Sequence, residues 1–195
     1  MSDEIKLDRR GVVKRLMGAC PEALVVAGLG SSAYDLFAAG DRDLNFYLWG
    51  AMGGAASIGL GLALAQPNRS VVALTGDGEQ LMGLGSLATI GAAQPNNLSV
   101  VVLDNGHYGE TGMQKSHTSL GTNLTAVAAA CGIAWSMDIS AMSDLPALAK
   151  RINAKQSCGL ARINVSADEL PRALPNRDAV FLKNRFRAAL GLEIM

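Results

Sequence analysis

Short apolar runs along the chain carry no polar alternation, and segments with helical spacing separate them. The strongest runs cover residues 23–27, 71–75 and 98–103, and weaker runs cover 133–139 and 160–165. Continuous aliphatic strands joined by helices are typical of a parallel sheet that is covered on both faces. Helices are expected at 32–38, from the glycine-rich turn 49–54 through residue 65, at 79–93, at 143–154 and at 176–190.

This pattern predicts an α/β protein with a single doubly wound parallel sheet and helices on both faces. The chain has 195 residues, a length that suits one domain. Residues 1–195 are therefore expected to form one domain with a C-terminal helical tail at 176–195. The tail helix is basic and amphipathic, and Val180, Phe181 and Phe186 are expected to pack it onto the domain. Ligands of such sheets collect at the carboxyl ends of the strands.

Composition and charge remove several classes of function. Seventeen basic side chains balance 17 acidic ones, so no basic excess points to a nucleic acid partner. The hydrophobic content of 49% excludes a disordered chain. Cys20, Cys131 and Cys158 form no C-x-x-C motif, which argues against a disulfide framework or a metal cluster. The N-terminus is charged and shows no secretory pattern, so a cytoplasmic protein is expected.

One uncharged stretch, residues 46–65, is long enough to span a bilayer, and Gly50 and Gly54 give it a G-x-x-x-G spacing. It contains five glycines, each of which weakens a helix by about 1 kcal/mol relative to alanine. The flanking residues Arg42 and Arg69 give no asymmetry of positive charge. We therefore expect no association with a membrane.

The sequence Gly28-Leu-Gly30-Ser-Ser-Ala33 lies between a predicted strand and a predicted helix, and it matches the G-x-G-x-x-A fingerprint of dinucleotide-binding folds. That fingerprint needs an acidic residue at the end of the next strand, about 20 residues on. The segment 40–43 is instead a turn with no β-rich run before it. A nicotinamide site therefore remains only an alternative, although the two serines of this turn could contact an anionic ligand.

A more specific pattern follows two consecutive predicted strands. Gly76-Asp77-Gly78 comes directly after the second strong run, and Asp104-Asn105 comes directly after the third. Asp77 and Asn105 are 28 residues apart, the length of one strand–helix–strand crossover, so both are expected at the same edge of the sheet. A carboxylate and an amide oxygen are ligands that Mg²⁺ prefers. The glycines allow a phosphate to approach the backbone, and the following helix directs N–H groups toward it.

These residues resemble the diphosphate-binding domain of thiamine-diphosphate enzymes. The GDG sequence at 76–78 followed by Asn105 is similar to the GDG–N motif of that family, and the GAMG sequence at 50–53 resembles its G-x-M-G segment. The resemblance covers roughly residues 25–139, and the run at 104–112 is most similar to sulfopyruvate and phosphonopyruvate decarboxylases. It implies the thiamine-diphosphate-binding fold, the cofactors thiamine diphosphate and Mg²⁺, and a small 2-oxo acid as substrate.

The resemblance also implies roles for residues at matching positions. The Mg²⁺ ligands would be the side chains of Asp77 and Asn105 and the backbone carbonyl of His107. The diphosphate would lie against the glycine motif and against backbone N–H groups of the two loops that follow the strands, which involve Gly76, Gly78, Glu79, Tyr108 and Gly109.

The rest of the cofactor would contact two other turns. Met52 would hold it in its bent conformation, and the Gly50 carbonyl would accept a hydrogen bond from its aminopyrimidine. Ser31 and Ser32 match the glycine–hydroxyl loop of the family. Many family members have serine or alanine where Glu79 stands, and a second carboxylate beside a diphosphate is unfavourable. The side chain of Glu79 is therefore expected to turn away.

The family carries its activating glutamate on a separate pyrimidine-binding domain, and 195 residues leave no room for a second such unit. The resemblance therefore implies a pyrimidine-domain (alpha) subunit as partner, in a hetero-oligomer with dimerised beta chains. The expected function is the cofactor-binding subunit of a 2-oxo acid decarboxylase, and no catalytic residue is assigned to this chain. An acetolactate-synthase-like carboligase subunit and a non-catalytic cofactor-binding subunit remain alternatives. The side chains of His107 and His117 either contact substrate or lie in solvent.

Overall fold

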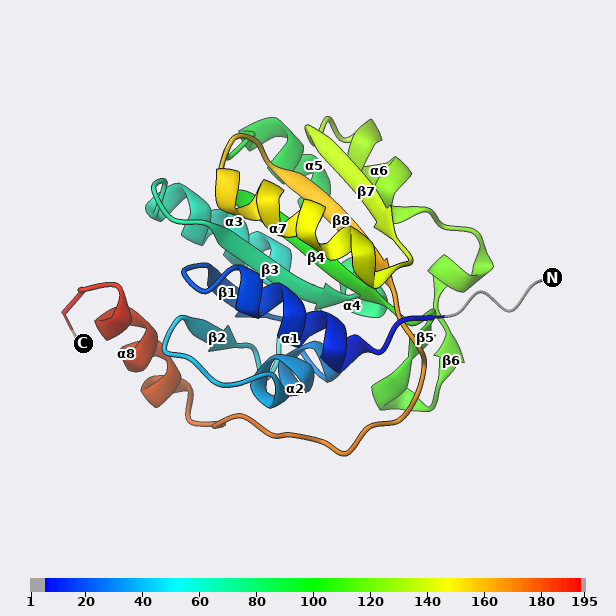
Figure 1. Cartoon of the computed structure of the whole chain (residues 1–195), viewed down its shortest axis with the longest axis horizontal. Helices are drawn as coiled ribbons and strands as arrows, with labels where there is room; N and C mark the ends of the chain where they lie inside the picture. The colour runs from blue at the N-terminus through cyan, green and yellow to red at the C-terminus, as the bar shows by residue number, and fades with distance from the viewer. Residues whose placement is uncertain (1–5, 194–195) are drawn as a thin grey trace.

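The computed structural model describes residues 6–193, and its centre is a six-stranded sheet whose neighbouring strands are all parallel (Figure 1). The strands are β1 (Leu24–Ala27), β2 (Asn45–Tyr47), β3 (Val71–Gly76), β4 (Leu98–Asp104), β7 (Trp135–Ile139) and β8 (Gly159–Asn164). Their order across the sheet is β2-β1-β3-β4-β8-β7. The prediction of an α/β fold with a doubly wound parallel sheet is confirmed.

Helices cover both faces of this sheet. One face carries α1 (Arg9–Ala19), α2 (Ser31–Ala38) and α7 (Leu145–Ala154), which follows the short 3₁₀ turn η3 (Met142–Asp144). The other face carries α3 (Ala55–Ala65), α5 (Ser86–Ala93) and α6 (Leu124–Ala130). Because successive side chains of a strand point to opposite faces, β3 gives Val72 and Leu74 to the first core and Val71 and Ala73 to the second.

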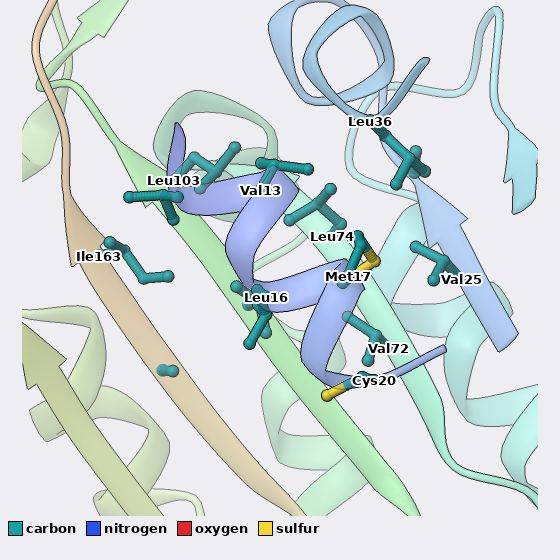
Figure 2. Packing of buried hydrophobic residues seen from close by; sticks show 14 of the residues in the cluster. Val13, Leu16, Met17, Cys20, Val25, Leu36, Val72, Leu74, Leu103 and Ile163 are labelled. Atoms are coloured by element: carbon teal, nitrogen blue, oxygen red, sulfur yellow. The ribbon is translucent and has the colours of Figure 1, made fainter. Parts of the chain in front are cut away.

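The pattern of apolar runs does not predict α1, yet this helix lies over the middle of one face. Figure 2 shows Val13, Leu16 and Met17 of α1 packed over β3 and β4, and all three side chains are buried. Asp8 caps the helix, because its carboxylate accepts hydrogen bonds from two N–H groups of the first turn at 3.2 and 2.9 Å. An N-cap before apolar residues at helical spacing is the signal that identifies α1.

A buried cluster of charges joins α1 to α2. Asp35 is fully buried, with Arg9 Nε 2.6 Å from its Oδ2 and Arg10 Nε 3.0 Å from its Oδ1. Arg9 is itself only 7% exposed. Burial raises the pKa of Asp35, and the two guanidinium groups oppose that shift. The cluster stabilises the packing of α1 only while both signs of charge are present, because either charge alone would be buried without compensation.

The predicted elements also omit β2, which has three residues and follows a polar turn. This strand is the edge of the sheet next to β1, and α8 (Ala179–Ala189) lies beside it (Figure 1). The rings of Phe46 and Phe186 pack edge to face across this contact, with centroids 5.8 Å apart. A long strap without regular structure leads from β8 to α8. Residues 1–5 and 194–195 of the predicted domain lie outside the described residues.

Only one of the three residues predicted to pack the tail helix does so. Val180 and Phe181 are 61% and 46% exposed, so the prediction that they pack the helix onto the domain is wrong. Phe186 is buried, as predicted, and Leu182 is buried with it. Residues four positions apart share one stripe of a helix, and the stripe through Leu182 and Phe186 leaves the two preceding residues outside the contact.

The helix predicted at 79–93 is two helices, so this prediction is wrong as well. Helix α4 (Asp77–Met82) ends at Gly83, and α5 begins three residues later. At the break the Gly83 backbone contacts the turn that precedes α3, where a Cβ on Gly83 would lie 2.2 Å from the Gly53 carbonyl oxygen. Two backbones approach this closely only when glycine provides the space. The break therefore holds the turn at 50–54 against the end of α4.

The uncharged stretch 46–65 divides into part of β2, the turn at 50–54 and the 11-residue helix α3. Over residues 6–193, no helix combines the length and hydropathy needed to cross a bilayer. Apolar character in this stretch therefore reflects packing of α3 against the sheet, where Ala56, Leu60 and Ala63 are buried.

Candidate functional site

The carboxyl ends of β1, β3 and β4 meet at one edge of the sheet, and the loops after them line a pocket. A hairpin of β5 (His107–Tyr108) and β6 (Gln114–Lys115), with the 3₁₀ turns η1 (Gly109–Thr111) and η2 (His117–Leu120), stands at this edge (Figure 1). The pocket brings together most residues expected to bind a cofactor: Ser31, Ser32, Met52, Gly76, Asp77, Gly78, Glu79, Asn105, His107, Tyr108 and Gly109. Gly50 does not line it, although Met52 of the same turn does.

Six further residues line the pocket and are not among those expected to bind a cofactor, although three of them lie in the motif-bearing segments 28–33 and 104–112. They are Arg9, Leu29, Leu103, Glu110, Thr111 and Val165. Arg9 belongs to α1, far from the motifs in the sequence, and Val165 follows β8. Their presence depends on the order of the strands and on the packing of α1, and only recognition of α1 from its N-cap would have indicated Arg9.

Asp77 is the central acidic group of the pocket. It is the first residue of α4, and it is only 2% exposed. Ser116 Oγ donates a short hydrogen bond to Asp77 Oδ2, and Thr118 Oγ1 lies 3.4 Å from the same oxygen. Burial raises the pKa of Asp77, the Ser116 hydrogen bond opposes that shift, and the negative charge of Asp104 adds to it. A buried carboxylate of this kind is poised to gain from a cation.

The raised pKa predicts how the stability of the cation-free chain depends on pH. The folded chain keeps the Asp77 proton at pH values where the unfolded chain, with an ordinary pKa of about 3.9, has lost it. The stability that Asp77 contributes is therefore fully present below that ordinary value and is lost as the pH rises through the raised pKa. With EDTA present, Asp77→Asn should be more stable than the parent at neutral pH, and urea denaturation should show this advantage shrinking on acidification. A pH-independent difference would contradict the assignment.

Asn105 and Asp104 follow β4 and have different partners. Asn105 Oδ1 accepts a hydrogen bond of 2.8 Å from the His107 N–H, which fixes the amide within its loop. Asp104 Oδ1 accepts bonds from the Gly106 N–H at 2.9 Å and from the Thr118 hydroxyl at 2.8 Å. The other oxygen of Asp104 faces Arg162 Nη1 at 3.5 Å. Asp104 is therefore committed to protein contacts, whereas the Asn105 amide oxygen retains a second lone pair.

The two histidines occupy different positions relative to the pocket. His107 lines it and is half-buried, and its Nδ1 lies 3.0 Å from the Asn105 carbonyl oxygen. His117 is exposed and is not a lining residue, and its Nδ1 lies 3.4 Å from the Tyr108 hydroxyl. The Tyr108 ring packs against the backbone of the glycine motif, since a Cβ on Gly78 would lie 2.6 Å from it.

The turn before α3 has an unusual backbone. Ala51 has a φ of +53°, in the left-handed region, and Gly53 has a φ of +93°. A non-glycine residue in this region costs about 1–3 kcal/mol, so it persists only where the surroundings enforce it. Here the contact between Gly53 and Gly83 enforces the turn, and the turn presents Met52, 37% exposed, to the pocket.

The side chain of Glu79 points toward the turn after β1. It is 4% exposed, and its Oε2 accepts a hydrogen bond of 2.9 Å from the Thr75 hydroxyl. Burial raises its pKa, which the Thr75 hydrogen bond and nearby backbone N–H groups oppose. A Cβ on Gly28 would lie 1.5 Å from Oε2. The first glycine of the G-x-G sequence therefore makes room for a side chain of this protein.

This contact predicts the effect of filling the space at Gly28. Gly28→Ala should destabilise the chain by about 1–3 kcal/mol, as overpacking in a filled interior does. In a Glu79→Ala background the same change should cost much less, because the clashing carboxylate is gone. Urea denaturation of the four chains gives the coupling. Gly18→Ala, a helix position with nothing near its Cβ, serves as the control, and equal costs of Gly28→Ala in both backgrounds would disprove the contact.

The donor set restricts which metal could bind here. Within the described part of the chain, no three His, Cys, Asp or Glu side chains converge as a ligand group. A cation at this pocket would instead take one carboxylate, one amide oxygen and a backbone carbonyl, with the remaining positions filled by ligand oxygens and water. This all-oxygen set fits Mg²⁺, which is usually held by one or two carboxylates together with substrate phosphates.

Comparison with known proteins decides the family. The sequence model described as "Thiamine pyrophosphate enzyme, C-terminal TPP binding domain" matches residues 29–176, most of the chain. The chain belongs to this thiamine pyrophosphate enzyme family. Thiamine pyrophosphate is thiamine diphosphate, so the family identity supports this cofactor for the pocket, and the predicted membership is confirmed.

Curated relatives of this family member are decarboxylases by name. It is 50% identical over 125 residues to a phosphonopyruvate decarboxylase of Streptomyces viridochromogenes, covering 64% of this chain and 31% of the relative. It is 44% identical over 126 residues to the sulfopyruvate decarboxylase subunit beta of Methanocaldococcus jannaschii, covering 64% and 66%. The beta subunit of Methanococcus maripaludis is 43% identical over 129 residues, covering 66% and 69%. The thiamine pyrophosphate enzyme domain thus spans about a third of the first relative and two thirds of the others.

A solved structure shows the same fold. An X-ray structure of a protein from Mycobacterium smegmatis, described as a thiamin diphosphate-dependent enzyme, superposes with a TM-score of 0.71 at 23% identity. The match covers 84% of this family member and 32% of the other chain. The arrangement of the sheet and its helices therefore also occurs as part of a longer chain.

Proposed function

We propose that the chain is the thiamine-diphosphate-binding subunit of a 2-oxo acid decarboxylase, formed as one domain over residues 1–195 with the tail 176–195. The convergence of Asp77 and Asn105 at the ends of neighbouring parallel strands, within one pocket, carries the proposal. The relatives are named for decarboxylation of phosphonopyruvate and sulfopyruvate. By similarity, the substrate is a small 2-oxo acid with a second anionic group.

The loops after β3 and β4 would bind both the cation and the diphosphate. Asp77, Asn105 and the His107 carbonyl would hold Mg²⁺, which neutralises the charge that burial makes costly at Asp77. The diphosphate would lie against the glycine motif and the start of the hairpin, at Gly76, Gly78, Glu79, Tyr108 and Gly109. Bound thiamine diphosphate supplies an electron sink for decarboxylation, which no side chain of this chain provides.

Two further turns would orient the organic part of the cofactor. Met52 would support its bent conformation from the constrained turn, and the Gly50 carbonyl would accept a hydrogen bond from the aminopyrimidine. Ser31 and Ser32, at the start of α2, would contact it from the β1 side of the pocket. The proposed cofactor contacts would thus lie on four loops at one edge of the sheet. Because the sheet holds these loops in place, the site would be preorganised before the cofactor binds.

The proposed complex contains a second type of chain, a pyrimidine-domain (alpha) subunit that contributes the activating glutamate, together with dimerised beta chains. The name of the sulfopyruvate decarboxylase relatives, subunit beta, supports a partner of this kind. Large apolar side chains on elements beside the pocket also support it: Met52, Met82 and Leu120 are 37%, 62% and 66% exposed. Exposed apolar groups beside a binding pocket are compatible with an interaction surface there. A cytoplasmic location fits the three free cysteines.

Co-expression with a pyrimidine-domain subunit tests the proposal. The two chains together should release CO₂ from phosphonopyruvate or sulfopyruvate in the presence of Mg²⁺ and thiamine diphosphate, and the single chain should release little. Product analysis separates the alternatives, because an aldehyde supports decarboxylation and a ligated acid supports the carboligase. Cofactor binding without turnover of any 2-oxo acid by the complex would contradict the proposal and favour a non-catalytic subunit.

A further inference from the structure

Two buried carboxylates lie close together at the end of β3 and β4, and two hydroxyls lie between them. Asp77 is 2% exposed and Asp104 is 6% exposed. Ser116, which is fully buried, donates to Asp77 Oδ2, and Thr118 Oγ1 lies 2.8 Å from Asp104 Oδ1. The two hydroxyl oxygens are themselves 2.9 Å apart. Like charges so near each other repel in a low dielectric, so the hydroxyls between them need an explanation.

Counting protons assigns the hydrogen bonds. Each hydroxyl has one proton to donate. The Ser116 proton goes to Asp77, because Ser116 Oγ donates to Asp77 Oδ2. The Thr118 proton goes to Asp104 at 2.8 Å, since the alternative contact with Asp77 is longer, at 3.4 Å. One hydroxyl therefore serves each carboxylate, and no proton is left for the 2.9 Å contact between the two hydroxyl oxygens. Ser116 and Thr118 are called the hydroxyl bridge because they lie between the two carboxylates.

The segment that carries the bridge is tied to the loop that carries the other proposed metal ligands. The Ser116 N–H donates to the Gly106 carbonyl at 2.8 Å, and the Ser119 hydroxyl donates to the same carbonyl at 2.7 Å. Gly106 lies between Asn105 and His107. The bridge therefore connects Asp77, at the end of β3, with the loop after β4 that presents Asn105 and His107.

Arg162 pairs with Asp104, so the two carboxylates have different protein partners. Its Nη1 lies 3.5 Å from Asp104 Oδ2, and its Nε is paired with Asp138 at 2.5 Å. Asp104 thus has protein partners on both oxygens, whereas the bridge contacts Asp77 only at Oδ2. Asp77 Oδ1 is the carboxylate oxygen that the bridge leaves for a cation.

We propose that Ser116 and Thr118 are positioning residues of the cation site, because their hydroxyl bridge turns Asp77 Oδ1 toward the cation and fixes it relative to the loop with Asn105 and His107. This inference rests on the proposed function, since it assumes that the pocket binds Mg²⁺ with thiamine diphosphate. Mg²⁺ demands near-ideal octahedral geometry, so the orientation of a one-oxygen ligand matters strongly. Groups that orient a metal ligand typically change metal affinity 10–100-fold when they are removed, and we expect about this effect here.

The test separates the hydroxyls from the size of the side chains. Ser116→Ala and Thr118→Val remove a hydroxyl, whereas Thr118→Ser keeps it and removes only a methyl group. Ser143→Ala is the control, because it removes a hydroxyl that lies in η3, away from the pocket, and that contacts Asp144. Mg²⁺ is titrated at a fixed thiamine diphosphate concentration with calorimetry, and circular dichroism compares the folding of all chains.

The first two variants should need about 10–100-fold more Mg²⁺ for half-saturation, and they should bind thiamine diphosphate normally once Mg²⁺ saturates. Thr118→Ser and Ser143→Ala should titrate like the parent. Parent-like Mg²⁺ titrations of both Ser116→Ala and Thr118→Val would overturn the proposal. If Ser116→Ala does not fold, Thr118→Val against Thr118→Ser decides alone. Failure of the parent itself to bind Mg²⁺ with thiamine diphosphate would instead reject the proposed function.

Discussion

Asp77→Ala is expected to abolish Mg²⁺-dependent binding of thiamine diphosphate, with a loss of more than about 100-fold, the upper range for groups that only orient a metal ligand. The reason is that the other two carboxylates lining the pocket are engaged elsewhere: Glu110 is paired with Arg172, and Glu79 points toward the turn after β1. Asp104 cannot replace it, because Arg162 and the Gly106 N–H occupy its two oxygens. Calorimetric titration of thiamine diphosphate at a fixed Mg²⁺ concentration gives the affinity.

The control for this result is a carboxylate at the opposite end of the sheet. Asp43 precedes β2 and its side chain is 73% exposed, so Asp43→Ala should bind thiamine diphosphate as the parent does. The cation-free Asp77→Ala chain should remain folded, since the substitution removes a carboxylate that is costly to bury without a cation. Parent-like affinity in folded Asp77→Ala would show that the cation, if one binds, is held elsewhere.

Asp35→Ala should destabilise the chain by about 3–5 kcal/mol, the usual cost of leaving one member of a buried ion pair without its partner. Arg9 would then be a buried guanidinium in the contact between α1 and the sheet, with no carboxylate beside it. Urea denaturation measures the loss. The double variant Arg9→Met with Asp35→Leu should recover much of it, because apolar residues of similar size replace both charges.

A loss below about 1 kcal/mol for Asp35→Ala, the size typical of an exposed ion pair, would contradict the description of this cluster as buried. Asp8→Ala provides a useful comparison on the same helix. It removes the N-cap of α1 and should cost about 1 kcal/mol. The difference between the two variants measures how much more α1 depends on its buried charges than on its cap.

The parts of the fold that the sequence predicts are those fixed by local pattern. The strands at 71–75 and 98–103 extend by one residue each in the structure, because uninterrupted aliphatic residues have one favourable place, the middle of a covered sheet. The glycine motif with Asp77 and the position of Asn105 follow from these strands, and a single crossover brings both residues into one pocket. Their roles toward a cofactor stay predictions.

The parts that the sequence does not predict depend on contacts between distant segments. Helix α1 does not stand out in the sequence because Arg9 and Arg10 are typical of surface residues. They can pack against the domain because both form ion pairs with Asp35 of α2. The break after α4 exists because Gly83 meets Gly53, which no local pattern records. Ser116 and Thr118 likewise read as polar loop residues until the fold places them between two carboxylates.

A crystal structure of the chain with thiamine diphosphate and Mn²⁺ in place of Mg²⁺ measures the cation site most directly, because the anomalous signal of Mn²⁺ identifies the metal. The site described here predicts one peak at inner-sphere distance from Asp77 Oδ1, the Asn105 amide oxygen and the His107 carbonyl, with diphosphate oxygens completing six ligands. A peak bound through Asp104, or a diphosphate bound at the glycine motif with no metal between it and Asp77, would contradict it.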